Sequence, residues 1–117
     1  MKGAISMLTF KFVFNEIQRV MLTANPSVVK DFLAIQINLT GLGGGTFYVE
    51  VKNGVLSVEP YEYYDRQAIL TISVSDFKKL ADGKLDAGEA YGDGRLKIDG
   101  SIEKSLELSE LMKTVKR

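Results

Sequence analysis

"TFYVEVKNGVLSVEP", residues 46–60, is the stretch from which the fold can be worked out. Apolar and polar residues alternate on both sides of Asn53-Gly54, as they do in two half-buried strands. Asn-Gly is the strongest short signal for a type I′ turn, whose two central residues need a positive φ. The turn fixes a register in which four apolar side chains share one face: Val49, Val51, Leu56 and Val58. These residues therefore predict an antiparallel hairpin with one apolar face.

Strand patterns recur on both sides of this hairpin. Apolar and polar residues alternate in "IQINLT" (35–40) before it, and in "AILTISV" (68–74) and "RLKID" (95–99) after it. Most of these strands have one apolar and one polar face, which is typical of a sheet that is covered on one side only. We therefore predict an α+β fold in which every helix packs on the same face of the sheet.

Helical patterns account for most of the remaining chain. They cover five segments: residues 9–22, 24–32, 75–83, 86–92 and 101–116. In the second segment Asn25 is the predicted N-cap, and Pro26 occupies the first helical position. In the fourth segment Asp86 and Glu89 have the spacing of a capping box. The acidic residues between 82 and 93 are therefore predicted to cap helices and form turns, since their spacing does not fit a calcium loop.

The last predicted helix has an unusually wide apolar surface. Leu108, Leu111 and Met112 fall on one side of it, while Ile102 and Leu106 fall on another. The apolar arc spans roughly 200°, whereas one docking surface usually needs a stripe of about 100°. Two interpretations follow: the helix packs against both the sheet and a neighbouring helix, or it lines an apolar cavity with one of its sides.

The glycine-rich stretch "GLGGGT" (41–46) could be taken for a phosphate-binding loop. Such loops connect a strand to a helix, because the helix N-terminus holds the phosphate. Here strand patterns lie on both sides of the loop, and the lysine of a Walker motif is missing. We predict a hairpin loop and no nucleotide site.

Composition restricts the chemistry available to the chain. The 117 residues carry no net charge, no histidine and no cysteine. A nucleic-acid binder normally shows a basic footprint, which is missing here. The usual general base, thiol nucleophiles and the commonest metal ligands are also missing. We therefore predict no enzymatic activity, no metal, no cofactor and no nucleic-acid partner, although carboxylates and tyrosines would still be available to an enzyme.

The length suits a single domain spanning residues 1–117. Met7 is an alternative start of the chain, in which case residues 1–6 would be disordered or foreign to the native protein. No apolar stretch approaches the length of about 18 residues that a transmembrane helix needs. A cytoplasmic location is therefore expected.

Three tyrosines cluster in "PYEYYD" (60–65): Tyr61, Tyr63 and Tyr64. They either lie half-buried at the end of a strand or form an amphipathic rim at a ligand opening or an interface.

Residues 68–113 resemble the sterol carrier protein type 2 family. The shared pattern is a strand, a helix that starts around Ser/Asp-Phe, a Gly-Lys, a short helix ending in an aromatic residue and Gly, then Leu-Lys-Ile-x-Gly and a final helix. Twelve residues carry it: Ser75, Asp76, Phe77, Leu80, Gly83, Lys84, Tyr91, Gly94, Leu96, Lys97, Ile98 and Gly100. Upstream of this stretch only the order of helices and strands fits the family.

The resemblance implies a five-stranded, mixed but mainly antiparallel sheet with all helices on one face. It also implies an apolar tunnel between sheet and helices that takes fatty acids, acyl-CoA or sterol-like lipids without chemical change. The predicted ligand-binding residues are Phe77, Leu80, Tyr91, Leu96, Ile98, Leu108, Leu111 and Met112. The N-terminal helix is not a close match to the family, and it either leaves the tunnel open or fills part of it.

The function predicted on these grounds is that of a small lipid carrier that makes transient contact with membranes. The alternative is a non-enzymatic interaction module, such as a homodimer or an accessory subunit, with a filled or vestigial cavity. The tyrosine cluster would then lie at the contact.

Overall fold

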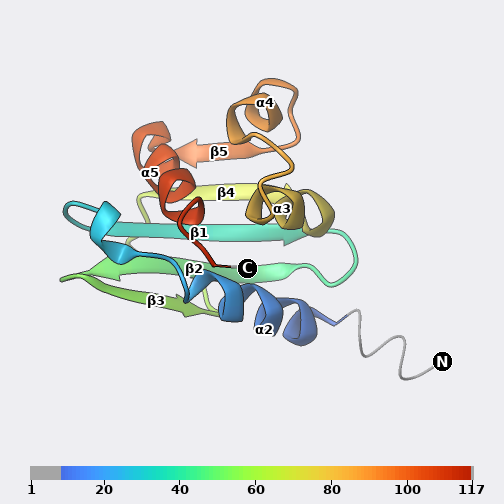
Figure 1. The fold of residues 1–117 in the computed structure, drawn as a ribbon. Coiled ribbons are helices and arrows are strands. Elements are labelled where there is room, and N and C mark those ends of the chain that lie inside the picture. The colour runs from blue at the N-terminus through green and yellow to red at the C-terminus, as the bar shows by residue number, and fades with distance from the viewer. Residues whose placement is uncertain (1–8, 117) are drawn as a thin grey trace.

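Five strands form one mixed sheet in the computed structural model, which describes residues 9–116 (Figure 1). The strands are β1 Leu33–Thr40, β2 Gly45–Lys52, β3 Val55–Glu59, β4 Ala68–Ser73 and β5 Lys97–Gly100. Their order across the sheet is β3-β2-β1-β4-β5. Only the central pair β1–β4 is parallel, and the other three neighbouring pairs are antiparallel. The predicted α+β sheet is therefore confirmed, and the alternative start at Met7 lies outside the described residues.

The β2–β3 hairpin has the register that the sequence predicts. Val51 pairs with Leu56 and Val49 with Val58. The turn residues Asn53 and Gly54 have φ values of 52° and 77°. The positive φ at both positions is what a type I′ turn requires.

The loop between β1 and β2 is a hairpin connection, as the flanking strand patterns predict. At Gly45 a side chain has no room, because an added Cβ would lie 2.6 Å from the ring of Phe10. This glycine lets the start of α2 pack directly on the β2 backbone. Close packing therefore accounts for part of the glycine content of a stretch that resembles a phosphate-binding loop.

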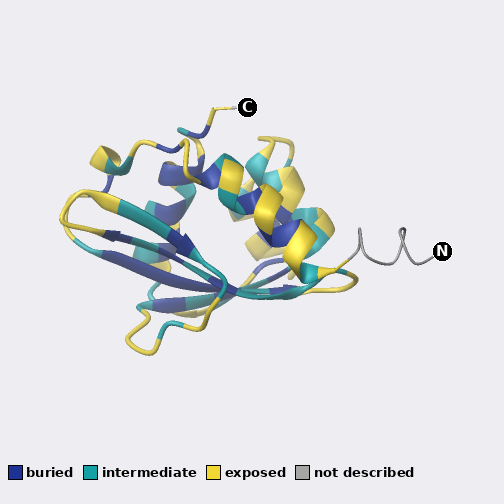
Figure 2. Cartoon of the chain, turned by 90° about the horizontal axis from the view of Figure 1, so that it is seen from below, coloured by how far each residue is buried: buried dark blue, intermediate teal, exposed yellow. Residues whose placement is uncertain are grey.

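The described helices all lie on one face of the sheet (Figure 2). They are α2 Phe10–Met21, the 3₁₀ helix η1 Pro26–Val28, α3 Val74–Ala81, α4 Ala87–Gly92 and α5 Ile102–Met112. Each helix begins with an N-cap residue whose side-chain oxygen accepts a hydrogen bond from a backbone N–H in the first turn. These N-caps are Thr9, Asn25, Ser73, Asp86 and Ser101. Such caps satisfy donors that the first helical turn leaves without a partner.

Three predicted helix boundaries are wrong. Residues 24–32 form only one 3₁₀ turn after Asn25, because the β-branched Val28 and Val29 favour extended backbone, which Val29 adopts. The helix expected from residue 75 begins earlier, at Val74, since Ser73 is the cap. The last helix ends at Met112 rather than near residue 116.

The core lies between the helices and the sheet and contains a row of three aromatic rings. The ring centroids of Phe14 and Phe47 are 5.7 Å apart, and those of Phe47 and Phe77 are also 5.7 Å apart, at an interplanar angle of 84°. All three side chains are buried. Edge-to-face packing of this kind contributes beyond the apolar area buried, so these rings tie α2 and α3 to β2.

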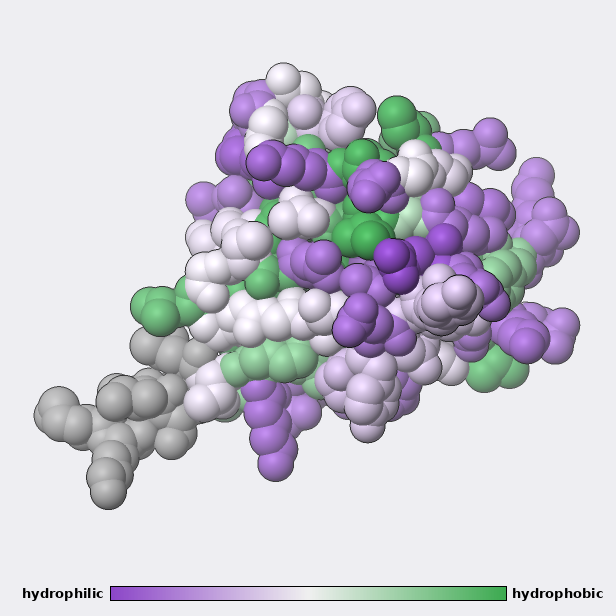
Figure 3. Space-filling model, turned by 180° about the vertical axis from the view of Figure 1, so that it is seen from behind, coloured by the Kyte–Doolittle hydropathy of each residue, from purple (hydrophilic) through white to green (hydrophobic). Residues whose placement is uncertain are grey.

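The face of the sheet without helices is crossed by the segment between β3 and β4, residues 60–67. The Tyr63 backbone N–H donates to the buried Gln36 side chain at 3.1 Å, and the Tyr63 hydroxyl donates to the Glu50 carboxylate at 2.6 Å. Seen from this side, much of the surface is hydrophilic or weakly polar (Figure 3). The sheet is thus covered by helices on one face and by a single polar crossover on the other.

Candidate functional site

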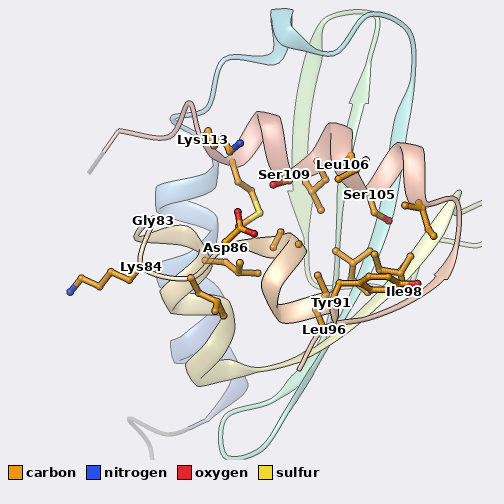
Figure 4. A pocket seen from close by; sticks show the side chains of 18 residues that line it. Gly83, Lys84, Asp86, Tyr91, Leu96, Ile98, Ser105, Leu106, Ser109 and Lys113 are labelled. Atoms are coloured by element: carbon orange, nitrogen blue, oxygen red, sulfur yellow. The ribbon is translucent and has the colours of Figure 1, made fainter. Parts of the chain in front are cut away.

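A partly open cavity of about 340 Å³ lies beneath α5, next to β4 and β5 (Figure 4). Most of its walls are apolar side chains from α5, α4, the α3–α4 connection and the edge of the sheet. Its apolar lining consists of Leu70, Leu80, Leu85, Ala87, Tyr91, Leu96, Ile98, Ile102, Leu106, Leu108 and Met112. Ligand pockets of about 300–1,000 Å³ with a mainly apolar lining are typical of sites for small molecules.

The wide apolar arc of α5 explains how one helix forms both core and cavity wall. Leu111 is fully buried in the core, and Leu108 is buried at the back of the cavity. Ile102 and Leu106 lie at the mouth, with 48% and 57% of their surface exposed. The structure therefore favours the cavity interpretation of this helix over packing against a second helix on that side.

The α3–α4 connection forms the opposite wall. Gly83 has a φ of 72°, which lets the chain turn away from the end of α3. The Lys84 N–H donates to the Lys79 carbonyl at 2.8 Å and closes that turn. Asp86 then starts α4, since its carboxylate accepts from the Glu89 N–H at 2.9 Å. The predicted cap is confirmed. The turn at Gly83 and the helix start at Asp86 place Leu85 and Ala87 in the cavity lining.

The predicted ligand-binding residues divide into two groups. Those that line the cavity are Leu80, Tyr91, Leu96, Ile98, Leu108 and Met112. Phe77 and Leu111 do not: each is buried, and Phe77 packs edge-on against Phe47. On α3, a difference of three residues thus separates a core anchor, Phe77, from a cavity residue, Leu80.

Five apolar lining residues are missing from the predicted set: Leu70, Leu85, Ala87, Ile102 and Leu106. The apolar arc of the last helix could have identified Ile102 and Leu106, because they form the side of that helix that the core does not need. Leu70 and Leu85 carry no local signal of this kind, since their role depends on how β4 and the α3–α4 connection are placed in space.

Few polar groups are available inside the cavity. The Ser105 hydroxyl donates to the Ser101 carbonyl at 2.8 Å within α5. Charged groups lie on the rim: Lys84, Asp86 and Lys113. Lys113 lies 2.9 Å from the Glu110 carboxylate, and this hydrogen bond raises the pKa of the Lys113 ammonium. In residues 9–116, no group of three or more acidic side chains is arranged to hold a metal ion.

A second cavity of about 390 Å³ lies between α2 and α3. Ile17, Met21 and Phe77 line it, together with charged side chains such as Arg19 and Lys78. It is more polar and more open than the first, so it is the weaker candidate for an apolar ligand. Helix α2 lies over the β2–β3 side of the sheet (Figure 1), and none of its residues lines the cavity beneath α5.

The tyrosine cluster belongs to neither cavity. Tyr63 is half-buried against Tyr48 on the helix-free face, while Tyr61 and Tyr64 are exposed. Of the two interpretations of this cluster, the structure supports half-burial for Tyr63 alone, and none of the three tyrosines forms a rim at this ligand opening. Across the described range, 9–116, no helix is long and apolar enough to cross a bilayer.

Comparisons with known proteins agree with this geometry. The model of the SCP-2 sterol transfer family matches residues 14–113. The chain is 30% identical over 105 residues to Hydroxysteroid dehydrogenase-like protein 2 of Mus musculus, covering 89% of this chain and 20% of that protein. It is 33% identical over 104 residues to Sterol carrier protein 2 of Homo sapiens, covering 85% of this chain and 19% of that protein. The chain thus spans about a fifth of the length of these relatives.

A solved structure shares the fold. Palmitated SCP2L2 from Aedes aegypti, determined by NMR in solution, superposes with a TM-score of 0.62 at 18% sequence identity. The match covers 86% of this chain and 90% of that one. The similarity at this level of identity concerns the arrangement of helices and strands.

Proposed function

This chain belongs to the SCP-2 sterol transfer family, and on that premise we propose that it binds the acyl chain of a lipid in the cavity beneath α5. The observation that carries the proposal is an apolar, partly open cavity at the edge of the core, built largely from residues of the family-like stretch 68–113. The solved relative that carries palmitate supports the acyl class.

The size of the cavity favours a single acyl chain. A cavity of about 150 Å³ is enough for the six carbons of benzene in another protein, so about 340 Å³ has room for about 14 apolar carbons. A flexible chain can adapt its shape to such a cavity, whereas a rigid ring system cannot. We therefore place fatty acids and acyl-CoA ahead of sterol-like lipids as ligands.

The expected affinity follows from the same number of carbons. Burying about 14 methylene groups at ~0.8 kcal/mol each gives about 11 kcal/mol before the cost of association, which is about 4–15 kcal/mol. At the low end of that cost, ~7 kcal/mol remains, which corresponds to a dissociation constant of about 10 μM. Affinity in this range lets a carrier release its ligand.

The role we propose is non-catalytic. No nucleophilic side chain in the cavity lining is paired with a general base, and the chain has no histidine or cysteine. Because its relatives are about five times longer, the chain's match corresponds to one domain of those proteins, and their activities are not transferred to it. The cytoplasmic location stays a prediction, which microscopy of the tagged protein would test.

Displacement of a fluorescent fatty acid by unlabelled lipids tests the proposal. Leu80→Trp and Ser109→Phe add bulk to two opposite walls of the cavity and should weaken binding at least about tenfold, since the added volume removes space for several methylenes. Leu42→Trp is the matched control, because Leu42 is 79% exposed in the β1–β2 loop and does not line the cavity.

Circular dichroism must first show that each variant is folded. Folded cavity-filling variants that bind as tightly as the wild type would contradict the proposal, as would a wild type that binds no fatty acid. Native mass spectrometry of the gently purified protein covers the alternative: a clean dimer without any lipid mass would favour the interaction module.

A further inference from the structure

Two serine hydroxyls interrupt the wall that α5 contributes to the cavity. Ser105 and Ser109 line the cavity, and the other lining residues of this helix are apolar up to Lys113 at its end. Ser105 is only 6% exposed, and within residues 9–116 it and Gln36 are the buried polar residues. Serine is neutral to unfavourable inside helices, so helix propensity does not account for it here. A buried hydroxyl therefore lies beside the space in which we place an acyl chain.

The Ser105 hydroxyl has its proton committed and its lone pairs available. It donates to the Ser101 carbonyl at 2.8 Å, one turn back along α5. A serine hydroxyl has one proton to donate and two lone pairs that accept. No donor from the described part of the chain reaches these lone pairs. Ser105 therefore offers the cavity a hydrogen-bond acceptor.

The Ser109 hydroxyl complements this acceptor. Within residues 9–116 it has no hydrogen-bond partner, so its proton is free to donate. Residues four apart on a helix have Cβ atoms about 5–6 Å apart. One oxygen atom placed between Ser105 and Ser109 can therefore lie within hydrogen-bond distance of both hydroxyls, which is about 2.5–3.0 Å. An alcohol fits this position because it both donates and accepts, whereas a ketone only accepts and a methylene does neither.

The serine pair is separate from the charged end of the cavity. Lys84, Asp86 and Lys113 line the cavity and are all exposed. In Figure 4, Lys84 and Lys113 lie toward one end of the cavity and Ser105 toward the other. Ser105 and Lys113 are eight residues apart, which is about 12 Å along a helix. A carboxylate can thus stay in water at the charged end while Ser105 lies beside a carbon of the chain.

We propose that the cavity beneath α5 selects acyl chains that carry a hydroxyl group along the chain. Ser105 and Ser109 are the specificity-determining residues: the ligand hydroxyl donates to the Ser105 oxygen and accepts from the Ser109 hydroxyl. This inference rests on the proposed function, because it assumes an acyl chain in this cavity. A hydroxyl held elsewhere along the apolar wall would lose its water without gaining a partner, which disfavours binding.

Displacement of the fluorescent fatty acid by hydroxylated tetradecanoic acids tests the selection. Each competitor carries a single hydroxyl, and the series places it at successive carbons of the chain. The wild type should bind one isomer, or two neighbouring ones, at least about fivefold tighter than the others, because only these place the hydroxyl between Ser105 and Ser109. It should also prefer the best isomer at least about fivefold over the acid with a keto group at the same carbon, which cannot donate to Ser105.

Variants assign the preference to the two serines. Ser105→Ala should remove most of the difference between the hydroxyl and keto acids, since the acceptor that distinguishes them is lost. Ser109→Ala should weaken both acids, because each accepts from Ser109. Ser75→Ala is the matched control: it removes a hydroxyl from an exposed position of α3 that does not line the cavity, and it should keep the wild-type preference.

The variants are expected to fold, because alanine suits a helix at least as well as serine does; circular dichroism verifies this. A wild type that binds all the isomers equally would overturn the selection. So would Ser105→Ala protein that distinguishes hydroxyl from keto as the wild type does, and this result would assign Ser105 to close packing of α5 alone.

The selection and the proposed function fail separately. Protein that binds the fluorescent probe and unmodified tetradecanoic acid, but shows no preference within the series, retains the lipid-binding function and loses the selection. Protein that binds neither the probe nor any of the acids contradicts the proposed function itself.

Discussion

Truncation of Phe77 to alanine should mainly lower the stability of the fold, whereas truncation of Leu80 on the same helix, α3, should mainly weaken lipid binding. Phe77 is 2% exposed and packs edge-on against Phe47, with ring centroids 5.7 Å apart. Removing a buried phenylalanine side chain costs about 3–5 kcal/mol of stability, including the cavity left behind. Leu80 is half-buried at the wall of the ligand cavity, so its truncation should cost only about 1 kcal/mol.

Both variants should remain folded at room temperature. A domain of 117 residues has a free energy of unfolding of about 6–18 kcal/mol at roughly 0.05–0.15 kcal/mol per residue. Urea unfolding should therefore show a much lower midpoint for Phe77→Ala and a small change for Leu80→Ala, with similar slopes. Fatty-acid displacement should rank them the other way, with about fivefold weaker binding for Leu80→Ala, since about 1 kcal/mol of wall contact is lost.

The result that refutes this reasoning is a reversal of either order. If Phe77→Ala lowered lipid affinity more than Leu80→Ala while barely changing the urea midpoint, Phe77 would be a ligand contact and the assignment of the cavity to the far side of α3 would be wrong. Phe77→Leu separates ring loss from volume loss, because it retains most of the buried apolar volume.

Three further changes test the fold around the site. Gly54→Val should lower the unfolding free energy by at least about 1–2 kcal/mol, measured by urea unfolding, because Gly54 has a φ of 77° and a β-branched residue resists that conformation; an unchanged midpoint would contradict the turn assignment. Gln67→Ala should cost about 1–3 kcal/mol in the same assay, since the Gln67 side chain accepts the N–H of the fully buried Ala34 at 2.8 Å and would leave it without a partner; a cost no larger than that of the exposed Glu62→Ala would refute this. The hydrogen bond to Glu50 raises the pKa of Tyr63 from 10.0 to about 12, so the folded state holds this proton more tightly than the unfolded state does. The stability that this hydrogen bond contributes is therefore present below pH 10 and is lost as the pH rises towards 12. Tyr63→Phe should flatten that part of the profile of melting temperature against pH, and an identical profile would contradict this reasoning.

Much of the fold follows from local signals in the sequence. Alternation of apolar and polar residues locates the strands, and Asn53-Gly54 sets the β2–β3 register without any tertiary information. The caps Asn25 and Asp86 likewise follow from local hydrogen-bonding chemistry. These elements were predictable because each is decided within a few residues.

The features that local sequence signals do not predict depend on how distant segments are placed in the fold. The crossover 60–67 buries the polar Gln36, which an alternating strand pattern assigns to an exposed face. The position of Tyr63 at Glu50 also depends on this crossover, which carries the tyrosines of residues 60–65 over the helix-free face and away from the cavity.

The candidate site was predictable in part for the same reason. Leu108 and Met112 could be placed on a wall of α5 by helical periodicity, and Leu96 and Ile98 by the family-like pattern. The division between Phe77 and the cavity depends on how α3 lies across the sheet, which periodicity alone does not determine.

Photo-crosslinking with a fatty acid that carries a diazirine along its chain tests the central claim most directly. After irradiation, digestion and mass spectrometry, the account predicts labels on the two walls of the cavity, within residues 80–91 and 102–113, that an excess of unlabelled fatty acid removes. Labels confined to α2 or to the β2–β3 hairpin, or no competed label on a protein that binds the probe, would contradict it.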